Sequence, residues 1–103
     1  MAKKVIWSQR AQNDRKKILK YWIARNKSND YSIKLNELFK EAINMLADYP
    51  EIGKITDNKG VRMKIVRDYL IIYEYEVKNE QLIILAIWDS RRNPQKLQKL
   101  LKK

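Results

Sequence analysis

The apolar residues of this 103-residue chain change their spacing once, and that change limits the folds the chain can adopt. From Tyr31 to Tyr49 they recur at steps of three and four residues, the repeat of one face of an α-helix. From Val61 to Trp88 they alternate or form short β-branched runs, which is typical of strands. Pro50 ends the helical pattern, and Glu51–Gly60, which holds both glycines, is predicted to be a loop. Helices therefore precede most of the strands, an order that favours an α+β fold.

Two helices are predicted ahead of Pro50. A β-branched and aromatic run, Lys4–Trp7, indicates a first strand, and Ser8 behind it suits the N-cap of a helix from Gln9 to about Arg25. Residues 26–30 carry breaking and capping side chains, so a second helix should begin at about Tyr31. Because the connection is short, the two helices should pack as an antiparallel hairpin.

Three further strands are predicted after the loop, and they share β-branched composition and flanking turn residues. They are Val61–Ile65, Leu70–Val77 and Gln81–Trp88, joined by turns at Arg67–Asp68 and Lys78–Glu80. The run Leu82–Ile87 does not alternate, which predicts a central strand covered on both faces for much of its length. The order is β-α-α-β-β-β, a two-layer α+β fold in which an N-terminal helical hairpin covers one side of an antiparallel sheet. We expect one domain over residues 1–103, with 94–103 as a basic tail that forms a short C-terminal helix.

The charge balance predicts a polyanionic or acidic partner. The chain has 23 Lys and Arg against 12 Asp and Glu, for a formal net charge of +11. Nucleic acid, an acidic protein and an anionic membrane surface all satisfy such a field, so charge alone does not choose among them. The first 25 residues hold eight basic residues and one acid, Asp14, which favours anion docking on the side of the first helix.

Residue types that are missing exclude several classes of protein. Without Cys there is no disulfide framework, and without Cys and His the usual ligands of zinc and most transition metals are absent. Glu74 and Glu76 share a strand face, but two carboxylates without a third oxygen ligand make a poor Mg²⁺ site, and cross-strand ion pairing explains them better. We expect no metal and no cofactor. No apolar run resembles a secretory signal or a membrane span, so we expect a cytoplasmic protein that does not enter membranes.

Basic residues near the predicted strands are candidates for binding phosphate. Arg62 and Lys64 should lie on one strand face about 6–7 Å apart, a separation that suits two oxygens of one phosphate. The alternative is a solvated strand face, since basic side chains also protect sheet edges. Arg91 and Arg92 follow the last strand and are expected to approach the same area. Further candidates are Arg67, Lys16 and Lys20, although lysines on a helix exterior are ordinary.

Four segments, taken in order, resemble the RelE/ParE superfamily of toxins, and together they cover nearly the whole chain. They are Val5–Ser8 with Ala11 and Asp14, Leu46 with Tyr49–Gly53, the basic pair Arg62 and Lys64, and Ile71–Tyr75 with Ile84–Trp88 and Ser90–Arg91. The resemblance implies the toxin of a bacterial toxin–antitoxin pair. It also implies a cognate antitoxin whose acidic, poorly structured segment wraps the toxin and folds on binding.

The resemblance implies one of two targets, and the shared fold does not decide between them. RelE-like members cut messenger RNA within the ribosome, whereas ParE-like members poison DNA gyrase and are not nucleases. Metal-free RNA cleavage needs a base, cations on the phosphorane and an acid. Resemblance to the nucleases assigns that work to Arg62, Lys64 and Arg91. The expected activity is therefore a metal-independent, ribosome-associated mRNA endonuclease, with a noncatalytic gyrase inhibitor as the alternative.

The chain also departs from the nuclease pattern. Leu70 or Ile71 stands where a further arginine is expected, and Leu97 falls near the place of a C-terminal tyrosine. Tyr69, Tyr73 and Tyr75 could substitute, but tyrosines that alternate along a strand are typically packing residues. This incomplete set of catalytic residues supports the alternative, a noncatalytic gyrase inhibitor. A nontoxic RNA- or DNA-binding module is a third hypothesis, and it predicts exposed aromatics among the cations.

Overall fold

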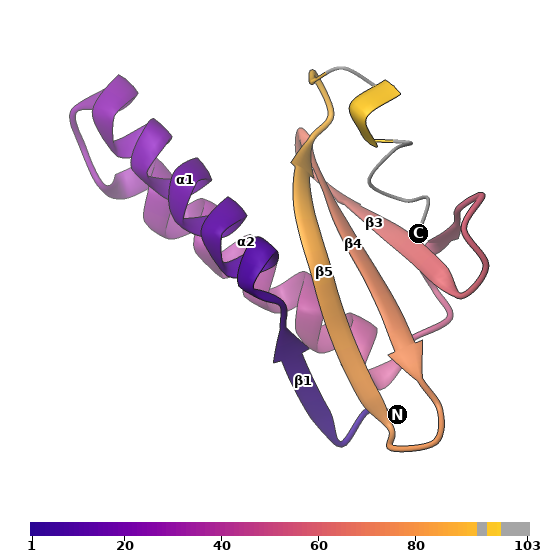
Figure 1. The fold of residues 1–103 in the computed structure, drawn as a ribbon. Coiled ribbons are helices and arrows are strands. Elements are labelled where there is room, and N and C mark those ends of the chain that lie inside the picture. Colours follow the sequence, from indigo (N-terminus) through magenta and orange to yellow (C-terminus); the bar gives the residue numbers. More distant parts are fainter. Residues whose placement is uncertain (93–94, 98–103) are drawn as a thin grey trace.

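The computed structural model describes residues 1–92 and 95–97, and its elements follow the predicted order with one addition. They are β1 (Lys4–Trp7), α1 (Gln9–Asn26), α2 (Asp30–Asp48), β2 (Lys54–Ile55), β3 (Val61–Val66), β4 (Tyr69–Glu76) and β5 (Gln81–Asp89). The predicted α+β class, with a helical hairpin on one side of a sheet, is confirmed (Figure 1). Among the described residues, no helix has the length and apolarity needed to cross a bilayer.

The sheet has the strand order β1-β5-β4-β3-β2 and is mixed, not wholly antiparallel as predicted. β3, β4 and β5 form the expected antiparallel meander, but β1 runs parallel to β5, with Lys4 opposite Gln81 and Trp7 opposite Ile84. A parallel pair needs a long crossover between its strands, and everything from α1 to β4 supplies it here. Four residues of strand composition carry no signal for direction, which is why the sequence did not reveal this pairing.

The segment predicted as a loop contains the two-residue strand β2. Lys54 and Ile55 pair antiparallel with Met63 and Arg62. The turn residues behind this strand act as predicted, because the Thr56 hydroxyl donates to the Val61 carbonyl and Gly60 adopts a φ of 85°. Two residues are too few to show a period of two, so only the turn could be predicted.

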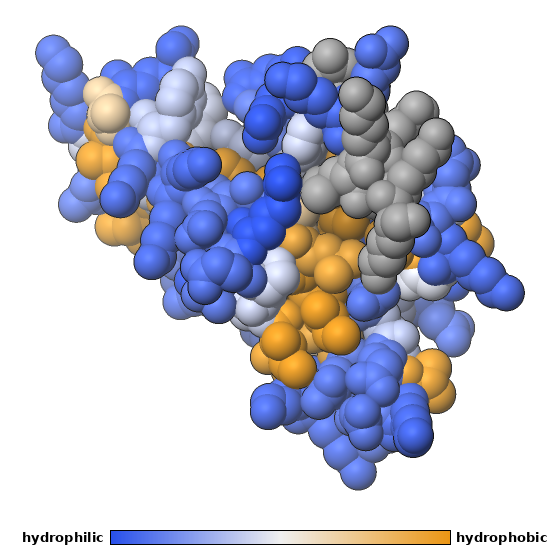
Figure 2. Space-filling model, viewed as in Figure 1, coloured by the Kyte–Doolittle hydropathy of each residue, from blue (hydrophilic) through white to orange (hydrophobic). Residues whose placement is uncertain are grey.

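The main core lies between the helical hairpin and the sheet. The α2 residues that face the sheet recur at helical spacing, and they meet alternate residues of β4 and β5. The buried members of this cluster are Ala11, Leu35, Phe39, Ala42, Ile43, Leu46, Val66, Tyr69, Ile71, Tyr73, Leu82, Ile84 and Ile87. A smaller cluster of Val61, Ile72, Ala86 and Trp88 covers the opposite face of the sheet, which is turned toward the viewer in Figure 2. β5 is therefore central and covered on both faces, as predicted.

Leu97 packs partly buried against the smaller cluster, and residues 95–97 are helical. The rest of the helix predicted for the basic tail, residues 98–103, lies outside the described residues.

Side chains at the start of α1 fix the helix to the edge of β5. Ser8 caps α1 by accepting from the Ala11 amide at 3.0 Å, and its hydroxyl donates to the Leu85 carbonyl at 2.8 Å. Two turns further on, Asp14 Oδ2 accepts from the Ile87 amide at 3.1 Å. β1 ends opposite Ile84, so these two side chains bond to the edge of β5 where the strand partner has stopped.

Two side chains of the sheet hold the turn that follows α2. The Tyr73 hydroxyl donates to the Pro50 carbonyl at 2.7 Å and accepts from the Gly53 amide at 3.0 Å. Arg62 Nη1 donates to the carbonyls of Glu51 and Gly53 at 3.0 and 2.9 Å. A Cβ on Gly53 would lie 2.7 Å from Cε1 of the Tyr73 ring, so only glycine fits. We call residues 50–53 with Tyr73 and Arg62 the clasped turn.

Candidate functional site

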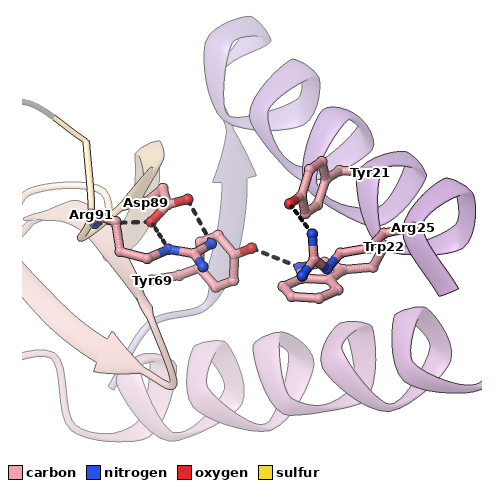
Figure 3. A network of polar contacts seen from close by, with 6 residues as sticks. All are labelled: Tyr21, Trp22, Arg25, Tyr69, Asp89 and Arg91. Atoms are coloured by element: carbon pink, nitrogen blue, oxygen red, sulfur yellow. Dashed lines mark hydrogen bonds and ion pairs between the residues drawn. The ribbon is translucent and has the colours of Figure 1, made fainter.

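A groove of about 370 Å³ lies between α1 and the end of the sheet where β5 stops. We call it the α1–β5 groove. One wall comes from α1 and the other from β4, β5 and the turn after β5 (Figure 3). Its lining residues are Asp14, Lys17, Ile18, Tyr21, Tyr69, Ile87, Asp89, Arg91 and Arg92.

The polar groups on the floor of the groove are bonded to one another. Trp22 Nε1 donates to the Tyr69 hydroxyl at 2.8 Å, which ties α1 to the first residue of β4. Burial raises the pKa of Tyr69, although the bond from Trp22 opposes that shift. The phenol is therefore neutral at physiological pH and is a poor base.

Arg91 and Asp89 form a close ion pair on the sheet wall. Arg91 donates from Nε to Asp89 Oδ1 at 3.0 Å and from Nη2 to Oδ2 at 2.9 Å. The Arg91 backbone amide also donates to Oδ1, at 2.9 Å. These bonds lower the pKa of Asp89 and raise that of Arg91, so both groups are charged at neutral pH. The Arg91 side chain remains 54% exposed and can still meet an anion.

The other cations that line the groove give it a positive rim. Lys17 and Arg92 join Arg91 there, and the Arg92 guanidinium lies 4.4 Å from the centre of the Trp88 ring. Arg67 is exposed in the two-residue turn between β3 and β4. This turn lies beside the turn after β5, since the Ser90 amide donates to the Asp68 carbonyl, so Arg67 is at the same end of the sheet. The structure thus gathers the predicted Arg67, Arg91 and Arg92 at one end of the sheet.

Arg62 and Lys64 lie elsewhere. They share one face of β3, as predicted, but Arg62 is opposite Tyr73 and Lys64 opposite Ile71, so both are on the helix side of the sheet. Asp89, beside Arg91, is opposite Tyr69, which lies four residues or about 13 Å along β4 from Tyr73. Arg62 is therefore displaced along the strands from Asp89, the partner of Arg91, whereas Lys64, opposite Ile71, is only two residues from the level of Tyr69. The catalytic roles of Arg62, Lys64 and Arg91 stay predictions.

Lys16 and Lys20 are exposed on α1 and do not line the groove, whereas Lys17 and Tyr21 do. Sequence reasoning did not select Lys17 and Tyr21 for a site. The signal was their spacing, since positions 14, 17, 21 and 25 recur along one helix face outside the apolar stripe. Tyr21 continues this face toward Arg25, whose Nη1 lies 3.5 Å from the Tyr21 hydroxyl (Figure 3).

Chemically, this arrangement has the charges to bind an anion. The cations Lys17, Arg91 and Arg92 line the groove together with the apolar Ile18 and Ile87, and Asp14 and Asp89 are held by hydrogen bonds from the protein. Within residues 1–92 and 95–97, no three carboxylates come together that could hold a metal ion. The groove suits a phosphate or a carboxylate that approaches Arg91, Arg92 and Lys17.

Comparison with known proteins places the chain in a family. Residues 5–94 match the sequence model of the family described as the ParE toxin of the type II toxin–antitoxin system parDE. The chain belongs to this toxin family. It is thus a ParE-family toxin of a type II toxin–antitoxin system, and membership implies a cognate antitoxin as partner. No curated protein matches the chain significantly.

Two solved structures are similar to this fold. A chain of the chromosomal ParDE toxin–antitoxin system from P. aeruginosa superposes with a TM-score of 0.68 at 16% identity, covering 82% of this chain and 91% of its own. The isolated E. coli RelE toxin gives a TM-score of 0.63 at 12% identity and covers 93% of each chain. At such low identities these likenesses support the fold alone, and the fold is common to both.

Proposed function

We propose that this toxin stops growth by binding DNA gyrase and does not cleave RNA. The observation that carries the proposal is that Arg62 and Arg91, two of the residues that resemblance assigns to cleavage, bond to different partners at different levels of the sheet. Arg62 bonds to two backbone carbonyls of the clasped turn. Arg91 instead pairs with Asp89, which lies opposite the first residue of β4. A nuclease needs these cations around one scissile phosphate.

The titratable groups of the groove support the same proposal. A general base for a 2′-hydroxyl works best with a pKa near neutrality. Burial shifts the pKa of Tyr69 upward and the bonds from Arg91 shift that of Asp89 downward, so both move away from the useful range. The groove therefore has the charges to bind an anion, and neither Tyr69 nor Asp89 is suited to act as the catalytic base.

The family match supports gyrase as the target. The matching family is that of ParE toxins, and in the resemblance described above the ParE-like members act on gyrase. This target implies that the toxin acts in the bacterial cytoplasm.

The antitoxin partner is proposed to be acidic and to place carboxylates in the α1–β5 groove. Lys17, Arg91 and Arg92 on its rim complement such a chain, and a net charge of +11 favours its approach. Binding should weaken as salt rises, since exposed charges are screened. Equal affinity at low and high salt contradicts this part of the proposal.

Induced expression in a bacterium tests the choice of target directly. We expect trapped gyrase–DNA breaks without new RNA ends, and inhibition of purified gyrase in a supercoiling assay. The double variant R62A/K64A should keep its toxicity in proportion to the amount of folded protein, because neither side chain contacts the target. New RNA ends without gyrase breaks, lost in that folded double variant, would instead establish the RNA endonuclease.

A further inference from the structure

The helical hairpin extends beyond the sheet that it covers. Figure 1 shows the C-terminal half of α1 and the N-terminal half of α2 projecting past the sheet. The bond from Trp22 to Tyr69 joins α1 to the start of β4, and the turn between the helices lies further out. We call residues 20–34, which include this turn, the hairpin tip.

The hairpin tip is ordered by its own contacts. The rings of Trp22 and Tyr31 meet edge to face with centroids 4.8 Å apart, which joins the two helices. Ser32 is only 5% exposed, and its hydroxyl donates to the Leu19 carbonyl at 3.1 Å. A single left-handed residue, Lys27 with a φ of 53°, ends α1 and keeps the connection short. A surface fixed in advance in this way loses little conformational entropy when it binds a partner.

The outer surface of the hairpin tip combines apolar and positive side chains. Ile33 is 60% exposed and Ile23 is 39% exposed. The cations of the tip are Lys20, Arg25, Lys27 and Lys34, all exposed, against the single acid Asp30. Figure 2 shows apolar surface near the end of the hairpin with hydrophilic surface around it. Exposed isoleucines on a projecting element have no role in the core of this chain.

We infer that the hairpin tip docks on an acidic, partly apolar patch of the toxin's target protein. Protein interfaces join an apolar centre to a charged rim and are enriched in Tyr and Arg. Binding to a nucleic-acid backbone would use the cations but would leave Ile23 and Ile33 in water. The excess of cations over acids requires a partner surface of negative charge. The inference rests on the proposed function, because it assigns the surface that recognises gyrase.

A pair of matched double variants tests this assignment. I33D/K34E changes the tip, and K54E/I55D makes the same chemical change in β2, where Ile55 is 70% exposed. Both variants lower the net charge equally. New acids in the first turns of α2 are favourable to the helix dipole, so the tip variant should fold. K20E/K27E is the second tip variant, to be used if thermal unfolding shows that the first one is not folded.

Affinity for purified gyrase and inhibition of supercoiling are the readouts, with wild type measured alongside. We expect the tip variant to lose at least about 30-fold in affinity, as for an interface hot spot. The β2 variant should stay within about twofold of wild type. Folded tip variants that match the β2 variant would overturn the inference while leaving the proposed function intact. Loss of binding to bare DNA with unchanged binding to gyrase also overturns it. A wild-type chain that does not inhibit gyrase overturns both proposals.

Discussion

Arg62 and Arg91 were predicted to act together, yet the structure places them in different surroundings. In the clasped turn, Arg62 donates to two backbone carbonyls and works beside the buried Tyr73. On the groove, Arg91 bonds to one carboxylate that belongs to its own turn and stays half exposed. The first arginine donates to backbone carbonyls of a turn, whereas the second holds a charge at the surface. The same residue type thus holds the fold together at one site and, in the proposed function, meets a ligand at the other.

The difference follows from what each guanidinium satisfies. Backbone carbonyls in a tight turn need hydrogen-bond donors from the protein or from water. The loss of Arg62 removes two such donors and should lower the free energy of unfolding. An exposed ion pair contributes little, because water and salt compete for both partners. Changes in the clasped turn should therefore affect stability, and changes on the groove should affect binding.

Gly53→Ala should give the largest effect, because the new Cβ overlaps the Tyr73 ring. We expect the free energy of unfolding to fall by about 3 kcal/mol, as for an overpacked core. Chemical denaturation of the purified protein measures it. Gly60→Ala is the control, since its Cβ meets nothing within 4 Å and only the positive φ of 85° is strained, at about 1 kcal/mol. Equal losses in the two variants contradict the close fit at Gly53.

Arg62→Ala compared with Arg91→Ala separates the two roles. Arg62→Ala should lower the free energy of unfolding by about 1–2 kcal/mol, because two carbonyl bonds are lost. Arg91→Ala should leave the Tm within experimental error but weaken retention on an anionic heparin column. The reverse ranking, with Arg91→Ala the less stable protein, would falsify the division between the clasped turn and the groove.

A smaller effect concerns the titration of Asp89. Because its bonds from Arg91 lower the pKa of Asp89 below the ordinary 3.8, the pair stabilises the fold above about pH 3.8 and loses this contribution as the pH falls through the lowered value. A carboxyl NMR titration should find the Asp89 midpoint below 3.8 in the wild type and nearer 3.8 in Arg91→Ala. An unchanged midpoint in that variant means that the ion pair does not persist in solution.

Much of the fold could be predicted, because the signals are local. The helical spacing of Leu35, Phe39 and Leu46 and the capping role of Ser8 placed α1 and α2 within one residue of their ends. The direction of β1 could not be predicted, since its four residues carry no signal for the strand with which they pair or for the direction of that pairing. β2 could not be predicted either, because its two residues are too few to show a periodic pattern.

The site was harder to predict than the fold. A strand period of two correctly put Arg62 and Lys64 on one face, but it does not say which face the helices cover. Nor does spacing along the chain show how far apart Arg62 and Arg91 lie in the sheet, because that depends on the register of β3 and β5 with β4. Tyr73 was expected to pack, and it does, but its bonds to Pro50 and Gly53 could be seen only once the turn was in place.

The pairing of the first strand with the last also sets the earliest point at which the sheet can be completed during synthesis. Residues 4–7 of β1 are synthesised 77 residues ahead of their partners, residues 81–84. The Ser8 hydroxyl likewise waits for a carbonyl 77 residues away. Contacts of such long sequence separation close late and fold slowly. A growing chain therefore cannot pair β1 within the sheet until residues 81–84 have been made.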